Sequence, residues 1–339
     1  MKLMRQRFAF FVFILLFSVC FFLMMYYGEK TFFVKKTAKS EAKKQAYHFV
    51  LIPEETDNEY WRIIEKGARE AAEKYNVYLE YLGPKRANMG EHVRILDKEI
   101  AGKVDGIMTQ GISEDHFTPI INKAMDRGIS VVTVDADAPY SRREVYVGTD
   151  NYAAGFLAGQ ALLEDTEGKQ VVGIVTGRFD ASHQRLRVQG FRDAVEKEKR
   201  IEIAGIKESG ISKTGAVQAT YDLLKEHPDI TAFYGTSALD GLGIARVIST
   251  MRPNSDPYII TFDTLPENMD LLRDGKIDAI VVQHPYEMGY RAVEMLVELK
   301  KGNHPERLQY TESHILRQRD LDQFLKENKG LFGDEDDPD

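Results

Sequence analysis

The sequence predicts a two-lobed α/β protein in which helices cover both faces of parallel sheets. From residue 47 onward, short apolar runs rich in β-branched residues alternate with amphipathic helical stretches. Repeated strand–helix units of this kind build open parallel sheets. The runs number about ten, which is too many for one comfortable twisted sheet. Two lobes of about five strands each therefore fit the pattern better.

The predicted strands are runs of four to eight residues bounded by Gly, Asp, Asn or Pro. Such runs are apolar on both faces, as buried parallel strands are. The first series comprises 48–53, 77–82, 106–111 and 129–135, and the second comprises 171–177, 201–206, 230–236, 258–263 and 279–283.

The predicted helices carry apolar residues at three- and four-residue spacing. In the first of them, Trp61 and Ala68 share one side, and Glu and Lys occupy the others. Asp57 or Asn58 is suited to cap its amino end. The predicted helices are 60–75, 88–100, 117–127, 153–163, 184–198, 214–226, 239–250, 267–273 and 287–300.

An uncharged run at the amino end predicts a transmembrane helix within a membrane anchor over residues 1–28. It extends from Phe8 to Tyr27, and at ~1.5 Å per residue its twenty residues would cross a bilayer core of ~30 Å. A cleaved signal peptide and lipidation at Cys20 are the alternatives. The bulky residues that follow Cys20 favour the uncleaved anchor over both.

Charge divides the chain into unlike parts. The net charge of −8 is the sum of +7 in residues 1–46 and −15 in the rest. We interpret 29–46 as a basic, solvated stalk that also suits anionic lipid head groups, and 329–339 as an acidic, disordered tail. An acidic body argues against nucleic acid as a partner, because phosphate binding needs a basic surface.

The orientation of the anchor is less direct. Three basic residues precede the apolar run and six lysines follow it, so the positive-inside rule taken alone mildly favours a cytoplasmic body. We nevertheless expect the body outside the cytoplasm, because the amino end resembles an export signal and because of the family resemblance described below.

The sequence lacks the motifs expected of disulfide, nucleotide-phosphate and metal sites. Cys20 is the only cysteine, so neither an intrachain disulfide nor a cysteine metal cluster is expected. No glycine-rich phosphate loop of either common spacing occurs. His183 and His284 have no partner at metal-ligand spacing. We therefore expect no cofactor and no metal.

Polar and aromatic residues follow the predicted strands, where ligands bind in open parallel sheets. Aromatic faces can stack on the C–H face of a sugar ring, and carboxylates, amides and an arginine can pair with adjacent hydroxyls. The candidate ligand-binding residues are Asn58, Tyr60, Trp61, Asp135, Asp137, Arg185, Ser237, Asp263 and Gln283.

Seven stretches resemble the ribose- and galactose-type periplasmic binding proteins, which serve sugar ABC transporters. They include DNEYWRIIEKGAREAAEKY (57–75), ISVVTVDADA (129–138), YVGTDNYAAG (146–155), QRLRVQGF (184–191), HPDITAFYGTSALDGLGIARV (227–247), IITFDTLPE (259–267) and LRDGKIDAIVVQHPYEMGYRAVE (272–294). The resemblance covers nearly all of 47–318. It implies the type I periplasmic binding protein fold, in which three crossovers join two Rossmann-like lobes. The first lobe would comprise 47–150 and 284–313, and the second would comprise 151–283 and 314–328.

By position, the resemblance implies roles for single residues. Tyr60 and Trp61 resemble the family's stacking aromatics, Arg185 its second-lobe arginine, and Gln283 the glutamine of the last crossover. Asn58, Asp135 and Asp263 resemble its leading asparagine, its first-lobe aspartate and its late aspartate. Two departures lie at Ala136, where the ribose type has an arginine, and at Ser237–Ala238, where an asparagine–aspartate pair is typical. We expect Asp137 to reach into the site in compensation for the missing arginine.

A competing interpretation gives the same residues structural roles. It makes Trp61 a core residue, Asp135 and Asp263 helix N-caps, and Arg185 a partner of a surface carboxylate. On that reading Asp150 is structural at the crossover.

The resemblance implies reversible capture of a small sugar and its delivery to the membrane subunits of an ABC importer. The alternative is a sensing subunit that presents its closed form to a membrane receptor or sensor histidine kinase. An enzyme is not expected: the carboxylates would suffice for a glycoside hydrolase, but no Ser–His–Asp or metal signature accompanies them. A transcription regulator is not expected either, since no DNA-binding segment precedes the body.

Overall fold

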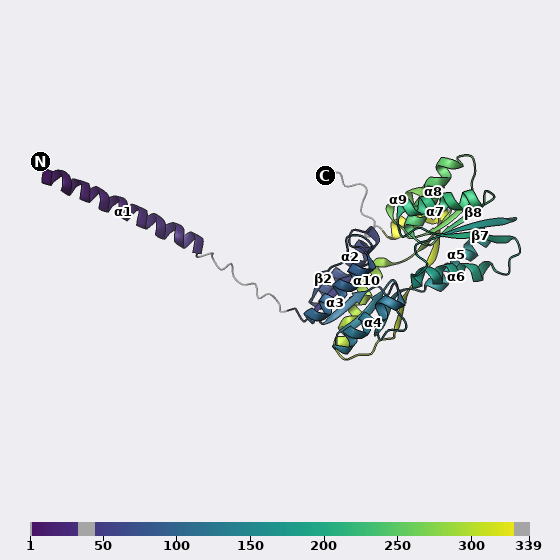
Figure 1. Ribbon diagram of the computed structural model, residues 1–339, viewed down its shortest axis with the longest axis horizontal. Helices are drawn as coiled ribbons and strands as arrows, with labels where there is room; N and C mark the ends of the chain where they lie inside the picture. The colour runs from purple at the N-terminus through teal and green to yellow at the C-terminus, as the bar shows by residue number, and fades with distance from the viewer. Residues whose placement is uncertain (1, 33–44, 329–339) are drawn as a thin grey trace. The chain divides into compact units, whose positions relative to one another are not determined.

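The computed structural model describes residues 2–32 and 45–328 (Figure 1). The chain divides into two compact units, Met1–Lys44 and Gln45–Asp339. Helix α1 (Lys2–Phe32) lies in the first unit and extends into the predicted stalk. Among the described residues, no helix meets the criteria of length and apolarity for crossing a membrane. Most of the predicted stalk and all of the predicted tail fall outside the described residues.

The second unit contains two six-stranded sheets. The first has the order β11-β5-β4-β3-β1-β2, and all of its strands pair in parallel. Its strands are β1 (Tyr47–Ile52), β2 (Val77–Tyr81), β3 (Gly106–Thr109), β4 (Ser130–Val134), β5 (Val145–Thr149) and β11 (Leu308–Thr311). We call this sheet and its helices lobe 1.

The second sheet has the order β12-β10-β9-β8-β6-β7. Its strands are β6 (Gln170–Thr176), β7 (Ile201–Glu208), β8 (Ala232–Gly235), β9 (Tyr258–Phe262), β10 (Ala279–Val282) and β12 (His314–Arg317). Strand β12 pairs antiparallel to β10, and the other strands are parallel. We call this sheet and its helices lobe 2.

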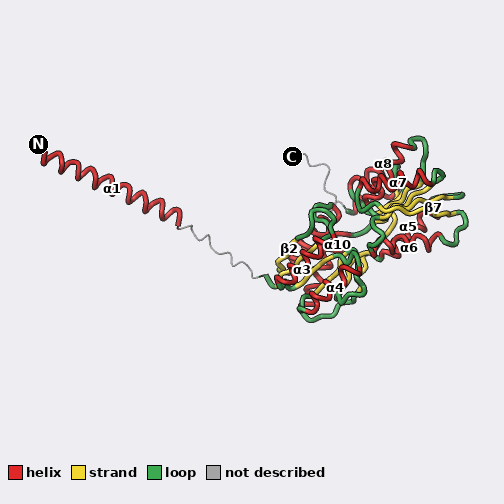
Figure 2. Tube along the Cα trace, viewed as in Figure 1, coloured by secondary structure: helices red, strands yellow, loops and turns green. Residues whose placement is uncertain are grey.

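Helices cover both faces of each sheet (Figures 1 and 2). In lobe 1, α2 (Glu59–Tyr75) and α10 (Pro285–Lys300) pack on one face, and α3 (Met89–Gly102) and α4 (Glu114–Asp126) on the other. The alternation of strand side chains decides this, since Phe49 and Leu51 join the first core cluster while Val50 and Ile52 join the second.

Lobe 2 repeats the arrangement. Helices α5 (Asn151–Asp165) and α6 (Ser182–Val195) pack on one face of its sheet. The other face is covered by α7 (Lys213–Glu226), α8 (Ala238–Met251), α9 (Pro266–Arg273) and α11 (Leu321–Glu327), the last of which follows the 3₁₀ turn η1 (Gln318–Asp320). The chain passes between the sheets after β5, after β10 and between β11 and β12.

The predicted two-sheet α/β architecture is confirmed, with one difference in strand number. Each sheet has six strands instead of about five. The predicted strand list omitted β5, β11 and β12. Strands β11 and β12 are partly exposed and carry polar residues, so they lack the continuous apolar run that marks a buried strand.

Candidate functional site

A cleft lies where the carboxyl ends of the two sheets face each other. In parallel sheets this edge is where ligands bind. Both lobes contribute to its wall. The lining residues are Glu54, Glu55, Asn58, Tyr60, Trp61, Gln110, Asp135, His183, Gln184, Arg187, Ile211, Ser237, Ala238, Leu239, Asp263, Leu265 and Gln283. Seven of the nine predicted site residues are among them, and Asp137 and Arg185 are not.

Helix α2 brings three predicted residues to the lobe 1 wall. Asn58 caps the helix, with its side chain accepting a hydrogen bond from the backbone N–H of Tyr60. Tyr60 and Trp61 meet edge to face, with ring centroids 6.2 Å apart. Trp61 is buried and packs in the lobe 1 core. It therefore contributes to the core and also lines the cleft.

Asp135 directly follows strand β4 and has a left-handed backbone conformation, with φ of +65°. Its Oδ1 accepts a hydrogen bond from the Tyr60 hydroxyl at 2.8 Å, and its Oδ2 accepts one from Nε2 of Gln110 at 2.8 Å. Backbone in this region is costly for a residue other than glycine and tends to occur at functional sites. The chain runs from β4 to β5 without an intervening helix, so Asp135 is not the helix N-cap of the competing interpretation.

Arg187 is the buried cation of the cleft. Its Nε donates to Asn151 Oδ1, its Nη1 to the carbonyl oxygen of Thr236 and its Nη2 to Gln283 Oε1, each at 2.8 Å. The guanidinium also stacks 4.0 Å from the ring centroid of Phe262. These contacts hold the planar group in a single orientation within the wall.

Asp263 is the corresponding carboxylate of lobe 2. It follows β9 with φ of +69°, and its Oδ1 accepts a hydrogen bond from Nε2 of Gln283 at 2.6 Å. Burial raises the pKa of Asp263 to about 6, and the attraction of Arg187 opposes that rise. Helix α9, which follows, begins after Leu265 without a side-chain cap, so Asp263 does not cap it.

Gln283 connects the two lobes at the crossover after β10. Its Oε1 accepts from Arg187 of lobe 2 and, at 2.7 Å, from the Thr149 hydroxyl at the end of β5 in lobe 1. Ser237 caps α8, and its hydroxyl donates to Asp240 Oδ2 at 2.8 Å. Asp150 caps α5, in agreement with the structural role considered for it.

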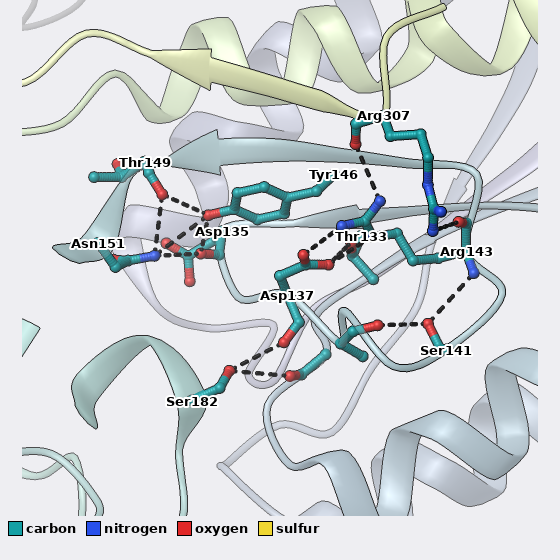
Figure 3. A network of polar contacts seen from close by, with 12 residues as sticks. Thr133, Asp135, Asp137, Ser141, Arg143, Tyr146, Thr149, Asn151, Ser182 and Arg307 are labelled. Carbon is teal, nitrogen blue, oxygen red and sulfur yellow. Dashed lines mark hydrogen bonds and ion pairs between the residues drawn. The ribbon is translucent and has the colours of Figure 1, made fainter. Parts of the chain in front are cut away.

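The structure places Asp137 and Arg185 away from the cleft wall. The carboxylate of Asp137 pairs with the buried Arg143 at 2.5 Å and accepts from Thr133, within a polar network beside the crossover strands (Figure 3). Arg185 is exposed, and its Nη1 donates to the carbonyl oxygens of Phe179 and Asp180.

Helix periodicity is the signal that would have identified Arg187 instead of Arg185. Gln184, Arg187, Phe191 and Val195 follow one another at three- and four-residue spacing, and all are buried on α6. Arg185 lies off that stripe. Gln110 directly follows β3, so the position rule that selected Asp135 and Asp263 applies to it as well. Its side chain accepts from the backbone N–H of Glu54 and donates to Asp135. Within the described ranges, no group of three or more His, Cys, Asp or Glu side chains is placed to hold a metal ion.

Comparisons with known proteins agree with this geometry. Residues 49–304 match the model of the periplasmic binding protein domain. The ribose import binding protein RbsB of Escherichia coli is 24% identical over 254 residues, which cover 74% of this chain and 84% of that protein. The D-ribose/D-allose-binding protein of Pseudomonas aeruginosa is 24% identical over 273 residues, covering 76% and 83%.

Solved structures are similar over about four fifths of the chain. GanP, a glucose–galactose binding protein from Geobacillus stearothermophilus, is 56% identical with a TM-score of 0.80, covering 82% of this chain and 99% of that one. A chain of the XylFII–LytSN complex is 33% identical with a TM-score of 0.76, covering 81% and 98%. The relatives named here are binding proteins rather than enzymes.

Proposed function

This chain belongs to the periplasmic binding protein domain family, and on that premise we propose that it reversibly captures a small sugar or sugar-like ligand between its lobes. The observation that carries the proposal is the composition of the cleft wall. Aromatic rings from α2 lie beside two buried carboxylates, and a buried arginine is held by three hydrogen bonds. Aromatic walls with a few fixed polar groups suit a small hydroxylated ring.

The proposed ligand contacts come from both lobes. Lobe 1 supplies Asn58, Tyr60, Trp61 and Asp135, and lobe 2 supplies Arg187, Ser237, Asp263 and Gln283. A ligand that touches both lobes favours the closed arrangement by the contacts that it makes only there. The two moving parts would be 47–150 with 284–313 and 151–283 with 314–328, a division that follows the strand membership of the two sheets.

Hexoses of the glucose and galactose type are the first candidates for the ligand. Support comes from the 56% identity to GanP, whose name gives glucose and galactose as its ligands. Pentoses are also candidate ligands, because the curated relatives include ribose-binding proteins.

Delivery to an ABC importer is the proposed role of the closed form. The relatives named as ribose import binding proteins support it. Sensing is the second candidate, in which the closed form is presented to a membrane receptor or sensor kinase. The XylFII–LytSN complex favours it, because there a chain similar to this one is bound to a second protein.

Membership of this family implies a body outside the cytoplasm. We further propose that residues 1–28 anchor the body to the membrane, on the evidence of the twenty uncharged residues from Phe8 to Tyr27. Fractionation tests the anchor: the full-length chain is expected in the membrane fraction after a carbonate wash. Recovery of a soluble, shortened chain would instead favour cleavage.

Binding can be followed through Trp61, which is the only tryptophan of the chain and lies in the cleft wall. Full-length protein in mild detergent would be titrated with D-galactose, D-glucose, D-ribose and L-arabinose, with tryptophan fluorescence and calorimetry as readouts. Saturable binding of one sugar at 1:1 stoichiometry is expected. No heat and no fluorescence change with any of them would contradict the sugar proposal.

The two roles predict different partners for the closed form. The sugar identified above would be added to native membranes, and site-specific cross-linking from the surface of either lobe would capture the neighbour. Importer membrane subunits captured only with sugar would support delivery. A receptor with an intracellular signalling domain would support sensing.

A further inference from the structure

A buried ion pair spans the two lobes at the rim of the cleft. Arg178 lies in the loop between β6 and α6 of lobe 2, and Glu54 lies in the loop between β1 and α2 of lobe 1. Nη2 of Arg178 is 2.8 Å from Oε1 of Glu54, and the two side chains are only 18% and 9% exposed. Apart from this ion pair, Oε1 has no hydrogen-bond partner among the described residues.

The pair is connected to the proposed ligand site. The backbone N–H of Glu54 donates to Oε1 of Gln110 at 3.1 Å, and Nε2 of Gln110 donates to Asp135 at 2.8 Å. Four residues after Arg178 in the chain, the Ser182 hydroxyl of lobe 2 donates to the carbonyl oxygen of Asp137 in lobe 1 at 3.0 Å (Figure 3). The β6–α6 segment therefore contacts lobe 1 at more than one point.

We propose that Arg178 is a positioning residue for lobe closure, which makes burial of the Glu54 carboxylate tolerable when the lobes meet. The proposal rests on the proposed function, because it concerns closure around the same site. Removing one partner of a buried ion pair leaves an uncompensated charge, which is far more costly than removing both. Closure should therefore depend on Arg178 as long as the Glu54 carboxylate is charged.

Burial is the dominant influence on the Glu54 carboxyl and raises its pKa from the ordinary 4.5 to about 7. The facing charges are Arg178 and Asp180 on the β6–α6 loop, Asp135 after β4, and the neighbouring Glu55. Arg178 opposes the rise and the three carboxylates add to it. A carboxyl whose pKa rises on closure favours the closed form at low pH and loses that advantage as pH rises through about 7.

The test compares Kd for D-galactose at pH 5.5 and pH 8.5 with full-length protein. The wild-type protein is expected to bind D-galactose at least about 10-fold more weakly at pH 8.5 than at pH 5.5, so its Kd is larger at pH 8.5. Arg178→Gln is expected to weaken binding at pH 8.5 by a further 10-fold or more, and by much less at pH 5.5, where Glu54 is protonated. Glu54→Gln should reduce the pH dependence to the few-fold change that Asp263 contributes.

The double variant decides between positioning and mere packing. Glu54→Gln/Arg178→Gln should recover most of the affinity that Arg178→Gln loses at pH 8.5, and Arg178→Lys should lose less than Arg178→Gln. Arg142→Gln is the matched control, since Arg142 forms an exposed ion pair with Asp126, and no change in Kd is expected from it. A double variant as weak as Arg178→Gln would overturn the proposal.

A measurement without sugar separates this proposal from the sugar assignment. By small-angle scattering at pH 8.5, Arg178→Gln should have a larger radius of gyration than the wild type and the double variant. Equal radii for all three would overturn the proposal. A wild-type protein that binds neither D-galactose nor D-glucose would instead overturn the hexose assignment, and the scattering comparison would still decide on Arg178.

Discussion

Arg187 and Gln283 are joined across the cleft wall by a hydrogen bond of 2.8 Å from Nη2 to Oε1. The same amide oxygen accepts from Thr149, and the amide nitrogen donates to Asp263. A helix of lobe 2, a crossover and a lobe 1 strand end thus meet at one side chain. The orientation of the arginine depends on all three.

Arg187→Ala is expected to weaken sugar binding by at least about 100-fold, because it removes a buried charged donor from the wall. It also takes a donor from Asn151 and Gln283 and the nearby positive charge from Asp263. Arg185→Ala is the matched control on the same helix, since Arg185 is exposed and contacts only nearby backbone. Calorimetric titration measures both. Equal losses in the two variants would contradict the assignment of Arg187.

Tyr60→Phe keeps the ring and removes the hydroxyl that donates to Asp135. We expect Kd to rise about 5- to 10-fold, because one hydrogen bond to a buried carboxylate is lost while the aromatic surface stays. Thermal unfolding should change little. A loss of affinity as large as that of Tyr60→Ala would show that the hydroxyl carries the whole contribution of the side chain.

Gly155→Ala tests whether helix packing sets the position of Arg187. A Cβ at Gly155 would lie 2.0 Å from the carbonyl oxygen of Arg187, so α5 and α6 must separate to accept it. We expect lower thermal stability together with weaker binding. Gly90→Ala is the control, because the nearest atom to its added Cβ is a side-chain oxygen at 3.6 Å. Unchanged affinity in Gly155→Ala would contradict the coupling.

Asp137→Asn should affect stability more than binding. Asp137 pairs with Arg143, whose side chain is only 3% exposed, and breaking a buried pair from one side costs about 3–5 kcal/mol. Denaturant unfolding measures this loss. Kd should stay within about threefold of the wild type, whereas Asp135→Asn should weaken binding strongly. The reverse pattern would restore Asp137 as a ligand contact.

Asp240→Asn should stabilise the protein progressively as pH rises. Burial raises the pKa of Asp240 to about 6, although hydrogen bonds from Ser237 and Thr236 oppose the rise. A native pKa above the unfolded value favours the native state at low pH, and this contribution is lost as pH rises through about 6. The difference in unfolding free energy between variant and wild type should grow by up to about 3 kcal/mol from pH 4 to pH 7. A constant difference would show that the carboxyl is already ionised throughout this range.

The sequence by itself determined the architecture and most of the cleft. Buried strands and amphipathic helices leave local periodic patterns in the sequence. The fixed repeat of a helix or strand decides which of its side chains point to the core, regardless of which distant residues they meet there. The two-sheet arrangement was predicted in this way. Polar residues directly after strands, such as Asp135 and Asp263, were placed at the cleft edge because parallel strands end together there.

Only the tertiary structure decided which polar residues meet. Arg185 and Arg187 differ by two positions on α6, and the rotation of the helix against α5 brings only the second to the cleft. Asp137 is drawn to Arg143, a partner six residues further along in the chain. The contact of Glu54 with Arg178 joins residues 124 positions apart. Such pairings depend on how lobes and helices pack, and packing is a property of the folded chain that no local pattern records.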